Sequence, residues 1–131
     1  MNIAQKIKEL GLPISSYIVV SSGILNALKI RESGDIDLIV SDKIYKKFED
    51  KGWQKSDWSD QVVLKHDVFD LGKSWYGKTV DELMPDITYV DGIPYLGLDP
   101  VYEWKKSLGR DKDLKDLILI EAYKARSNYI N

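Results

Sequence analysis

The stretch RESGDIDLIV, Arg31 to Val40, places two aspartates, Asp35 and Asp37, at the start of an apolar run that is typical of a buried strand. Carboxylates are seldom buried without compensation, and two that share one face of a strand repel each other. Residues two apart in a strand project from the same face. The pair therefore suggests a site at which a bound cation neutralises both charges.

The composition is that of an ordinary globular domain. The chain has 131 residues, of which 44% are hydrophobic and 31% charged. This length allows one sizeable core but not two, so we expect a single domain spanning residues 1–131. The net charge of -2 provides no broad basic surface for nucleic acid. No apolar run suits a membrane span or a signal peptide, which favours a cytoplasmic protein without membrane contact.

The side chains available as metal ligands are few. The chain has no cysteine and one histidine, His66, which excludes disulfides, thiolate zinc sites and a histidine cage. Any metal would be held by oxygen atoms, the ligands that Mg²⁺ and Mn²⁺ prefer. His66 precedes Asp67 in a predicted strand and should point away from it, so a surface or hydrogen-bonding role is favoured over that of a general base.

Local patterns predict most of the secondary structure. Helices are expected at 2–10, 24–30, 42–51, 79–84, 99–109 and 111–126, and strands at 17–20, 35–40 and 61–71. Residues 53–58 read as a polar turn or as the edge strand of a hairpin. Asp91-Gly92 lies between two apolar runs and predicts a β-hairpin, with Pro94 confining the second run to a sheet edge. Residues 114–120 give the last helix a broad apolar sector.

A third acid would complete a site for two divalent ions. Asp67, in the segment KHDVFDL, lies on the third predicted strand. Asp70 is the less favoured candidate, because odd spacing in one strand turns it to the opposite face. Asp35, Asp37 and Asp67 are therefore the candidate metal ligands and catalytic residues.

Ser21, Ser22 and Gly23 follow the first predicted strand at a junction with a helix. Backbone N–H groups at such junctions bind anions, and glycine allows a phosphate to approach the backbone closely. A triphosphate would be held by these amides on one side and by metal on Asp35 and Asp37 on the other. Taken alone, each motif is more often structural: an Asp-x-Asp is usually a strand end or solvated turn, and SSG an ordinary loop.

The order and spacing of these motifs resemble the nucleotidyltransferase superfamily of the DNA polymerase beta type. Ser22-Gly23 is similar to the family's Gly-Gly or Gly-Ser pair, Asp35-Ile36-Asp37 to its Asp-hydrophobic-Asp strand, and Asp67 to its later single acid. RESGDIDLIV and GRDKD, residues 109–113, resemble segments of small stand-alone members, including toxins of abortive-infection and toxin-antitoxin systems. Ser22 departs from the glycine that the family mostly has.

The resemblance implies an α+β (α/β-like) fold with a small mixed β-sheet, helices packed on it, and C-terminal helices. It implies transfer of a nucleoside monophosphate from an NTP, ATP or GTP, to a hydroxyl of a small molecule, protein or RNA, with Mg²⁺ or Mn²⁺ as cofactor. Asp113 would orient neighbouring groups or stabilise a helix N-terminus. Expected nucleotide contacts are Ser21, Ser22, Gly23, Arg31, Ser33 and Lys112.

Two other functions remain open. The small size favours a catalytically weak or inactive member of a toxin-antitoxin-like pair, with a protein partner or as a homodimer, because larger transferases add a domain that holds the acceptor. A metal-dependent nuclease is also possible, although its acids usually lack a Ser/Gly phosphate cradle. Trp53, Trp58 and Trp75 could form a stacking platform for a base or serve as partly buried anchors.

Overall fold

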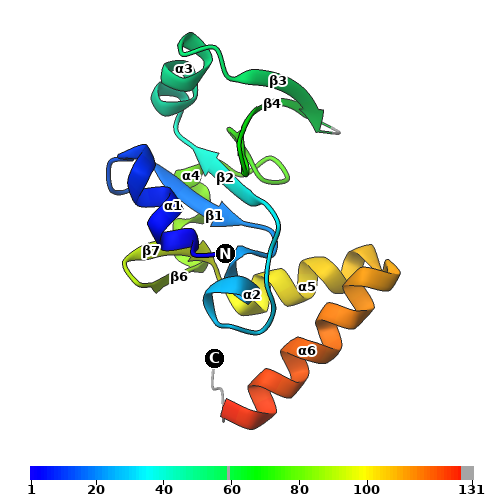
Figure 1. Ribbon diagram of the computed structural model, residues 1–131. Coiled ribbons are helices and arrows are strands. Elements are labelled where there is room, and N and C mark those ends of the chain that lie inside the picture. The colour runs from blue at the N-terminus through cyan, green and yellow to red at the C-terminus, as the bar shows by residue number, and fades with distance from the viewer. Residues whose placement is uncertain (59, 128–131) are drawn as a thin grey trace.

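The computed structural model describes residues 1–58 and 60–127, and one seven-stranded mixed sheet runs through them (Figure 1). The predicted single domain also includes residues 59 and 128–131, which lie outside the described residues. The strands are β1 (Tyr17–Val20), β2 (Ile36–Val40), β3 (Gln54–Trp58), β4 (Gln61–His66), β5 (Phe69–Gly72), β6 (Ile87–Val90) and β7 (Ile93–Leu96). Their order in the sheet is β3-β4-β5-β2-β1-β7-β6.

Six α-helices and a short 3₁₀ helix accompany the sheet in the described part of the chain. They are α1 (Ile3–Leu10), α2 (Gly23–Ala27), α3 (Asp42–Asp50), α4 (Val80–Leu83), η1 (Met84–Asp86), α5 (Leu98–Leu108) and α6 (Asp111–Ser127). The predicted α+β class, with a mixed sheet and C-terminal helices, is confirmed. No helix among the described residues is long and apolar enough to cross a bilayer.

The core lies around β1 and β2, which pair antiparallel at the centre of the sheet. Every residue of β1 is buried, and so is every residue of β2 except Asp37. Continuous apolar runs of this kind are typical of strands that are covered on both faces. Asp37 is therefore the one charged residue in the two central strands.

Local signals account for the ends of several elements. Asn2 accepts a hydrogen bond from the Gln5 amide at 3.0 Å and begins α1, and Thr79 begins α4 in a capping box with Glu82. Asp91 and Gly92 both have positive φ, as a two-residue hairpin turn requires. Residues 54–58 form an edge strand paired with β4, which settles the alternative left open by the sequence.

The single strand predicted for residues 61–71 is wrong. Asp67 has a φ of 53° and starts a turn, after which β5 runs antiparallel to β4. Aspartate tolerates this left-handed conformation better than most residues. The reversal changes which side chains share a face, and it pairs Asp70 with Asp37 across the parallel strands β5 and β2.

The edge position predicted for the Pro94 strand is also wrong. β7 lies between β6 and β1 in the sheet. Its register with β1 is limited to Val19 opposite Tyr95, which leaves Pro94 outside that ladder. A proline lacks the N–H that a strand ladder needs. Because the β1–β7 register is so short, Pro94 costs it no hydrogen bond.

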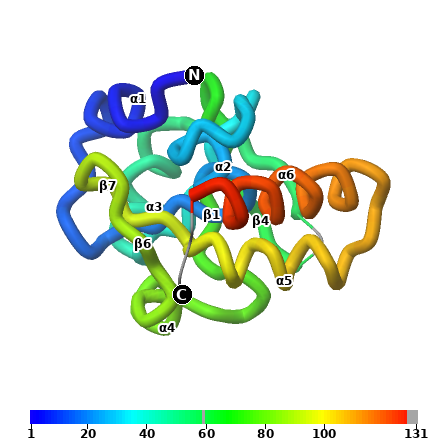
Figure 2. The backbone as a smooth tube through the Cα atoms, turned by 90° about the horizontal axis from the view of Figure 1, so that it is seen from below, coloured from blue at the N-terminus to red at the C-terminus, as the bar shows by residue number. Residues whose placement is uncertain are grey.

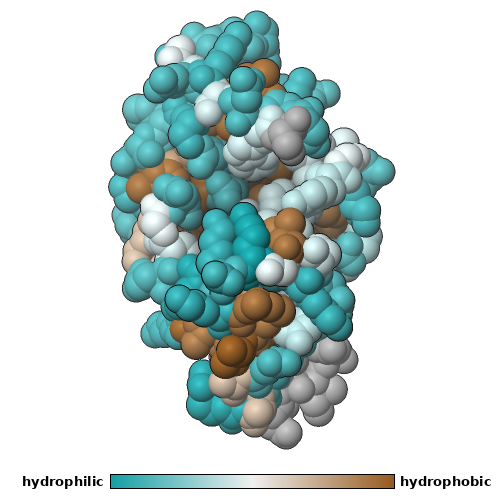
Figure 3. Space-filling view, turned by 90° about the vertical axis from the view of Figure 1, so that its right-hand side faces the viewer, coloured by the Kyte–Doolittle hydropathy of each residue, from teal (hydrophilic) through white to brown (hydrophobic). Residues whose placement is uncertain are grey.

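The C-terminal helices α5 and α6 lie side by side below the sheet (Figure 2). Of α6, only Asp113, Asp116 and Ile120 are buried. Leu114 and Ile118, members of the predicted apolar sector, are 49% and 65% exposed. Figure 3, which faces the side where α6 lies, shows apolar residues at the surface there. Charged rather than apolar residues therefore hold much of α6 against the protein.

Gly23 is required by packing. A Cβ atom at this position would lie 2.3 Å from Val19 Cγ1, whereas one at Gly34 would have no atom within 4 Å. We expect Gly23→Ala to lower the free energy of unfolding by about 1 to 3 kcal/mol, as overpacked cores do. Urea denaturation would measure it. Gly34→Ala is the matched control, and equal stabilities of the two variants would contradict this packing.

Candidate functional site

A cleft of about 680 Å³ opens beside the β1–α2 junction and the segment before β2. The six predicted nucleotide contacts all line it, namely Ser21, Ser22, Gly23, Arg31, Ser33 and Lys112, and so do Asp35 and Asp37. Asp67 does not. The structure thus gathers residues from widely separated segments into one place, which has the size of common ligand pockets.

The acid beside Asp37 is Asp70. The two side chains are close enough to share a hydrogen bond, which contributes to the raised pKa of Asp37. Asp70 is only 6% exposed and forms an ion pair with Lys65, its partner in the β4–β5 register. A row of Asp37, Asp70 and Lys65 therefore crosses three neighbouring strands, and one cation faces two carboxyl groups.

The negative charge of Asp37 is poorly balanced by its surroundings. The pKa of Asp37 is raised to about 6, chiefly by burial and also by the negative charges of Asp70 and Asp35, while a hydrogen bond from the Ser21 hydroxyl lowers it. The pKa of Lys65 is raised, chiefly by its hydrogen bond to Asp70. Perturbed carboxyl groups of this kind are common in functional sites.

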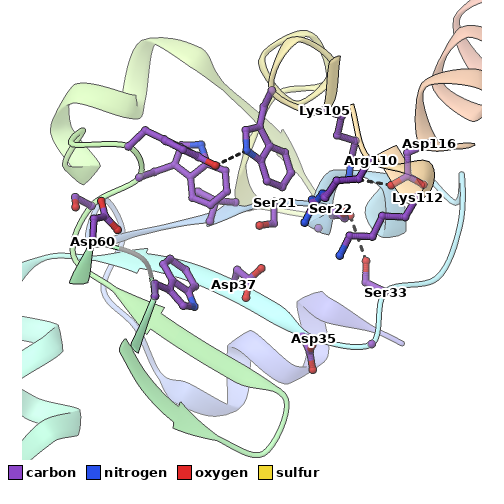
Figure 4. A pocket seen from close by; sticks show the side chains of 18 of the residues that line it. Ser21, Ser22, Ser33, Asp35, Asp37, Asp60, Lys105, Arg110, Lys112 and Asp116 are labelled. Atoms are coloured by element: carbon purple, nitrogen blue, oxygen red, sulfur yellow. Dashed lines mark hydrogen bonds and ion pairs between the residues drawn. The ribbon is translucent and has the colours of Figure 1, made fainter. Parts of the chain in front are cut away.

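The other two predicted acids do not join this pair. Asp67 lies in the β4–β5 turn, where its Oδ2 is 3.1 Å from Lys6 Nζ of α1. Asp35 is exposed, makes no hydrogen bond or ion pair with a described residue, and points away from Asp37 (Figure 4). In the described part of the chain, no three acidic or histidine groups lie close enough together to hold a metal ion. The expected convergence of three acids is not formed.

The β1–α2 junction is tightly constrained. Ser21 has a φ of 58°, a conformation that is uncommon for residues other than glycine. The Ser33 hydroxyl donates to the Ser22 carbonyl at 3.2 Å and ties the two segments together (Figure 4). Gly23 is buried against Val19, so packing explains this glycine without any phosphate.

A buried network of charges joins α5 and α6 to the segment before β2. Arg31 donates to both carboxylate oxygens of Asp116, at 2.6 and 2.8 Å. Lys105, which is 3% exposed, lies 2.8 Å from Asp116. Burial would raise the pKa of Asp116, but the hydrogen bonds from Arg31 and Lys105 hold it below its ordinary value. Arg31 therefore has a structural partner within the cleft.

Asp113 also has a structural role. It is fully buried and accepts hydrogen bonds from the Arg110 backbone amide and guanidinium. The Arg110 side chain lowers the pKa of Asp113. Lys112, by contrast, is exposed, points into the cleft and has no hydrogen bond or ion pair with a described residue (Figure 4). Its ammonium group is therefore available to bind an anion in the cleft.

Sequence reasoning missed part of the cleft. Trp104 and Tyr76 line it together with Trp58 and Trp75. The helical spacing of Trp104 puts it on one face with Val101 and Leu108, which does not indicate a cleft, and nothing in the local sequence of Tyr76 indicates its position. Comparison of the chain with protein-family models, curated proteins and solved structures finds no match.

The raised pKa of Asp37 predicts that Asp37→Asn makes the folded protein more stable, by an amount that depends on pH. Between its ordinary pKa of 3.8 and about 6, the folded protein keeps a proton that the unfolded chain has released. Stability contributed by this group is therefore lost as the pH rises through that window. At pH 7.5 we expect Asp37→Asn to be more stable than the native chain by about 1 to 3 kcal/mol, and the gain to shrink towards pH 4.

Denaturation at several pH values would measure this gain. The exposed Asp57, changed to Asn, is the control and should show no such trend. A pH-independent difference between Asp37→Asn and the native chain would contradict the assignment.

The network around Asp116 predicts a large loss of stability in Asp116→Ala. Removing one partner leaves the charge of Lys105 buried without its nearest carboxylate, a change that lowers the free energy of unfolding by about 3 to 5 kcal/mol. Thermal and urea denaturation would measure it. Asp111→Ala, on the exposed first turn of the same helix, should lose about 1 kcal/mol at most, and similar losses would refute the role of the network.

Proposed function

We propose that this protein transfers a nucleoside monophosphate from an NTP to a hydroxyl group of an acceptor, with Mg²⁺ or Mn²⁺. One observation carries the proposal: Asp37, which is buried and hydrogen-bonded to Asp70, lines the same cleft as Lys112, a cation without a partner among the described residues. The pair suits a divalent cation, and Lys112 suits a phosphate. The resemblance of the motifs to nucleotidyltransferases supports the same reaction.

The donor set of the cleft fits a hard cation. Mg²⁺ is commonly held by one or two carboxylates together with substrate phosphates, rather than by a complete protein cage. Asp37 and Asp35 line the cleft, Asp70 is hydrogen-bonded to Asp37, and the exposed Asp35 has no described partner to restrain its side chain. When bound, such an ion neutralises phosphate charge and lowers the pKa of an attacking hydroxyl. In this proposal Asp70 has the role that was predicted for Asp67.

In the proposed reaction the residues of the chain bind, orient and accept a proton. Lys112 holds the β- and γ-phosphates, with the exposed part of Arg110 beside it. The acceptor oxygen forms a bond to the α-phosphorus, and the bond from that phosphorus to the bridging oxygen breaks, so that pyrophosphate leaves with the bonding electrons. The hydroxyl proton passes to the carboxylate of Asp37, which lines the cleft.

A second candidate function rests on α6. Leu114, Ile118 and Leu119 are 49%, 65% and 38% exposed on this helix. Exposed apolar groups on one helix are typical of a surface that binds another protein. This observation favours the alternative in which the chain is an inactive member of a toxin-antitoxin-like pair.

The acids provide a sharp test of transfer. With Mn²⁺ and labelled ATP or GTP, we expect Asp37→Asn and Asp70→Asn to reduce labelling of acceptor mixtures at least 100-fold, since each removes a ligand and charge. Asp67→Asn should stay within about threefold, because its partner is Lys6 outside the cleft.

Calorimetry of each variant with Mn²⁺ and ATP or GTP adds a measurement that needs no acceptor. Equal losses in Asp67→Asn and Asp70→Asn would overturn the site. An absence of NTP binding to the native chain would refute transfer and leave the protein-partner function.

A further inference from the structure

Four aromatic residues line part of the cleft: Trp58, Trp75, Tyr76 and Trp104, here called the aromatic wall. The Trp75 ring centroid lies 5.0 Å from those of Tyr76 and Trp104, and 6.4 Å from that of Trp58. The interplanar angles are 90°, 66° and 78° respectively. Rings that meet edge to face do not form a parallel pair around one flat base. Instead, several of their ring surfaces line the same part of the cleft.

Tyr76 is held in this wall at the expense of backbone strain. It has a φ of 50° in a two-residue turn, closed by hydrogen bonds between Trp75 and Lys78 of 2.8 and 3.0 Å. A two-residue turn requires positive φ at its central residues, and a residue as bulky as tyrosine is uncommon there. Tyr76 is 65% exposed, so burial does not explain the strain. Its hydroxyl accepts a hydrogen bond from Trp104 Nε1 at 2.8 Å.

The charges of the cleft are divided between its ends. Asp60, two residues after Trp58, lies at the end opposite Arg110 and Lys112, with Asp37 between them (Figure 4). Asp60 is exposed and has no hydrogen bond or ion pair with a described residue. The Asp60 end therefore combines ring faces with an uncompensated negative charge.

Ring faces of tryptophan and tyrosine attract cations, and aromatic cages recognise ammonium groups in this way. The wall already shows such a contact, because Lys105 Nζ lies 4.9 Å from the centre of the Trp104 ring. A phosphate would be repelled by Asp60. The chemistry of this end therefore selects a positively charged ligand that presents methyl or methylene groups to the rings.

We propose that the aromatic wall and Asp60 bind the ammonium group of the acceptor, a small molecule that carries both an ammonium group and a hydroxyl. This assignment to the acceptor rests on the proposed function. In-line transfer requires the attacking hydroxyl to lie opposite the leaving pyrophosphate. With pyrophosphate at Lys112, the acceptor approaches Asp37 from the Asp60 end, where its ammonium group meets the wall.

Choline and 3,3-dimethylbutan-1-ol test the charge preference, because the second compound is the neutral carbon counterpart of the first. Each is titrated into the full chain, and tryptophan fluorescence is followed in a Trp53→Phe background. Trp53 packs on Phe48 and His66 and does not line the cleft. Its replacement therefore leaves the fluorescence of the tryptophans in the aromatic wall. We expect saturable choline binding in the millimolar range, at least tenfold tighter than binding of the neutral compound. Equal affinities would overturn the proposal.

Variants locate the bound ammonium group. Asp60→Asn and Trp58→Leu should each weaken choline binding at least fivefold, and Asp57→Asn, on the same strand as Trp58, should leave it unchanged. Asp60→Asn changes an exposed side chain and keeps the test valid if Trp58→Leu fails to fold. Unchanged choline binding in Asp60→Asn would overturn the site.

Calorimetry with ATP or GTP and Mn²⁺ separates the acceptor from the nucleobase. Loss of nucleotide affinity in Asp60→Asn, equal to the loss for choline, would show that this end holds the base and would overturn the proposal. Unchanged nucleotide affinity in that variant supports it. Selective choline binding in a chain that binds no nucleotide would refute the proposed transfer while the ammonium site stands.

Discussion

The ion pairs of Asp116 hold the cleft together. Asp116 projects inward from α6 and meets Arg31, from the segment before β2, and Lys105, from α5. Much of the apolar surface of α6 faces outward, so hydrophobic burial alone does not fix the position of this helix. Buried charges contribute specificity more readily than stability, since a displaced helix would leave them unpaired. The network thus determines where Lys112, one turn before Asp116, stands relative to the sheet.

The carboxyl pair in the sheet shows the opposite balance. Asp116 receives two cations, whereas among the described residues Asp37 and Asp70 have one, Lys65, which pairs with Asp70 and is half exposed. Burial makes the ionised form of Asp37 unfavourable. A chain optimised for stability alone would have an apolar residue at position 37, like the neighbouring Ile36 and Leu38. Polar residues that lower stability in this way are typical of functional sites.

The sequence was sufficient where a signal is local. The helix caps at Asn2 and Thr79 and the Asp91-Gly92 turn depend on residues within a few positions, and they were predicted. Asp70 was ranked below Asp67 because odd spacing in one continuous strand would turn it to the opposite face, and the Asp67-Val68 turn that breaks this strand contains neither glycine, proline nor asparagine. A continuous strand of that length would exceed the usual 5 or 6 residues, which was the available warning. The aromatic wall and the Asp116 network join segments far apart in the sequence, and no local pattern reports such packing.

The two faces of α6 relate the two candidate functions. Its inner face carries Asp113 and Asp116 and completes the cleft, while its outer face exposes Leu114 and Ile118. A protein bound to the outer face would therefore leave the cleft open. Any influence of that partner on the site would pass through the rigid ion pairs of Asp116 to Arg31, and from there to the segment that carries Asp35 and leads into Asp37. Transfer and partner binding can thus coexist in one chain, because they use opposite sides of the same helix.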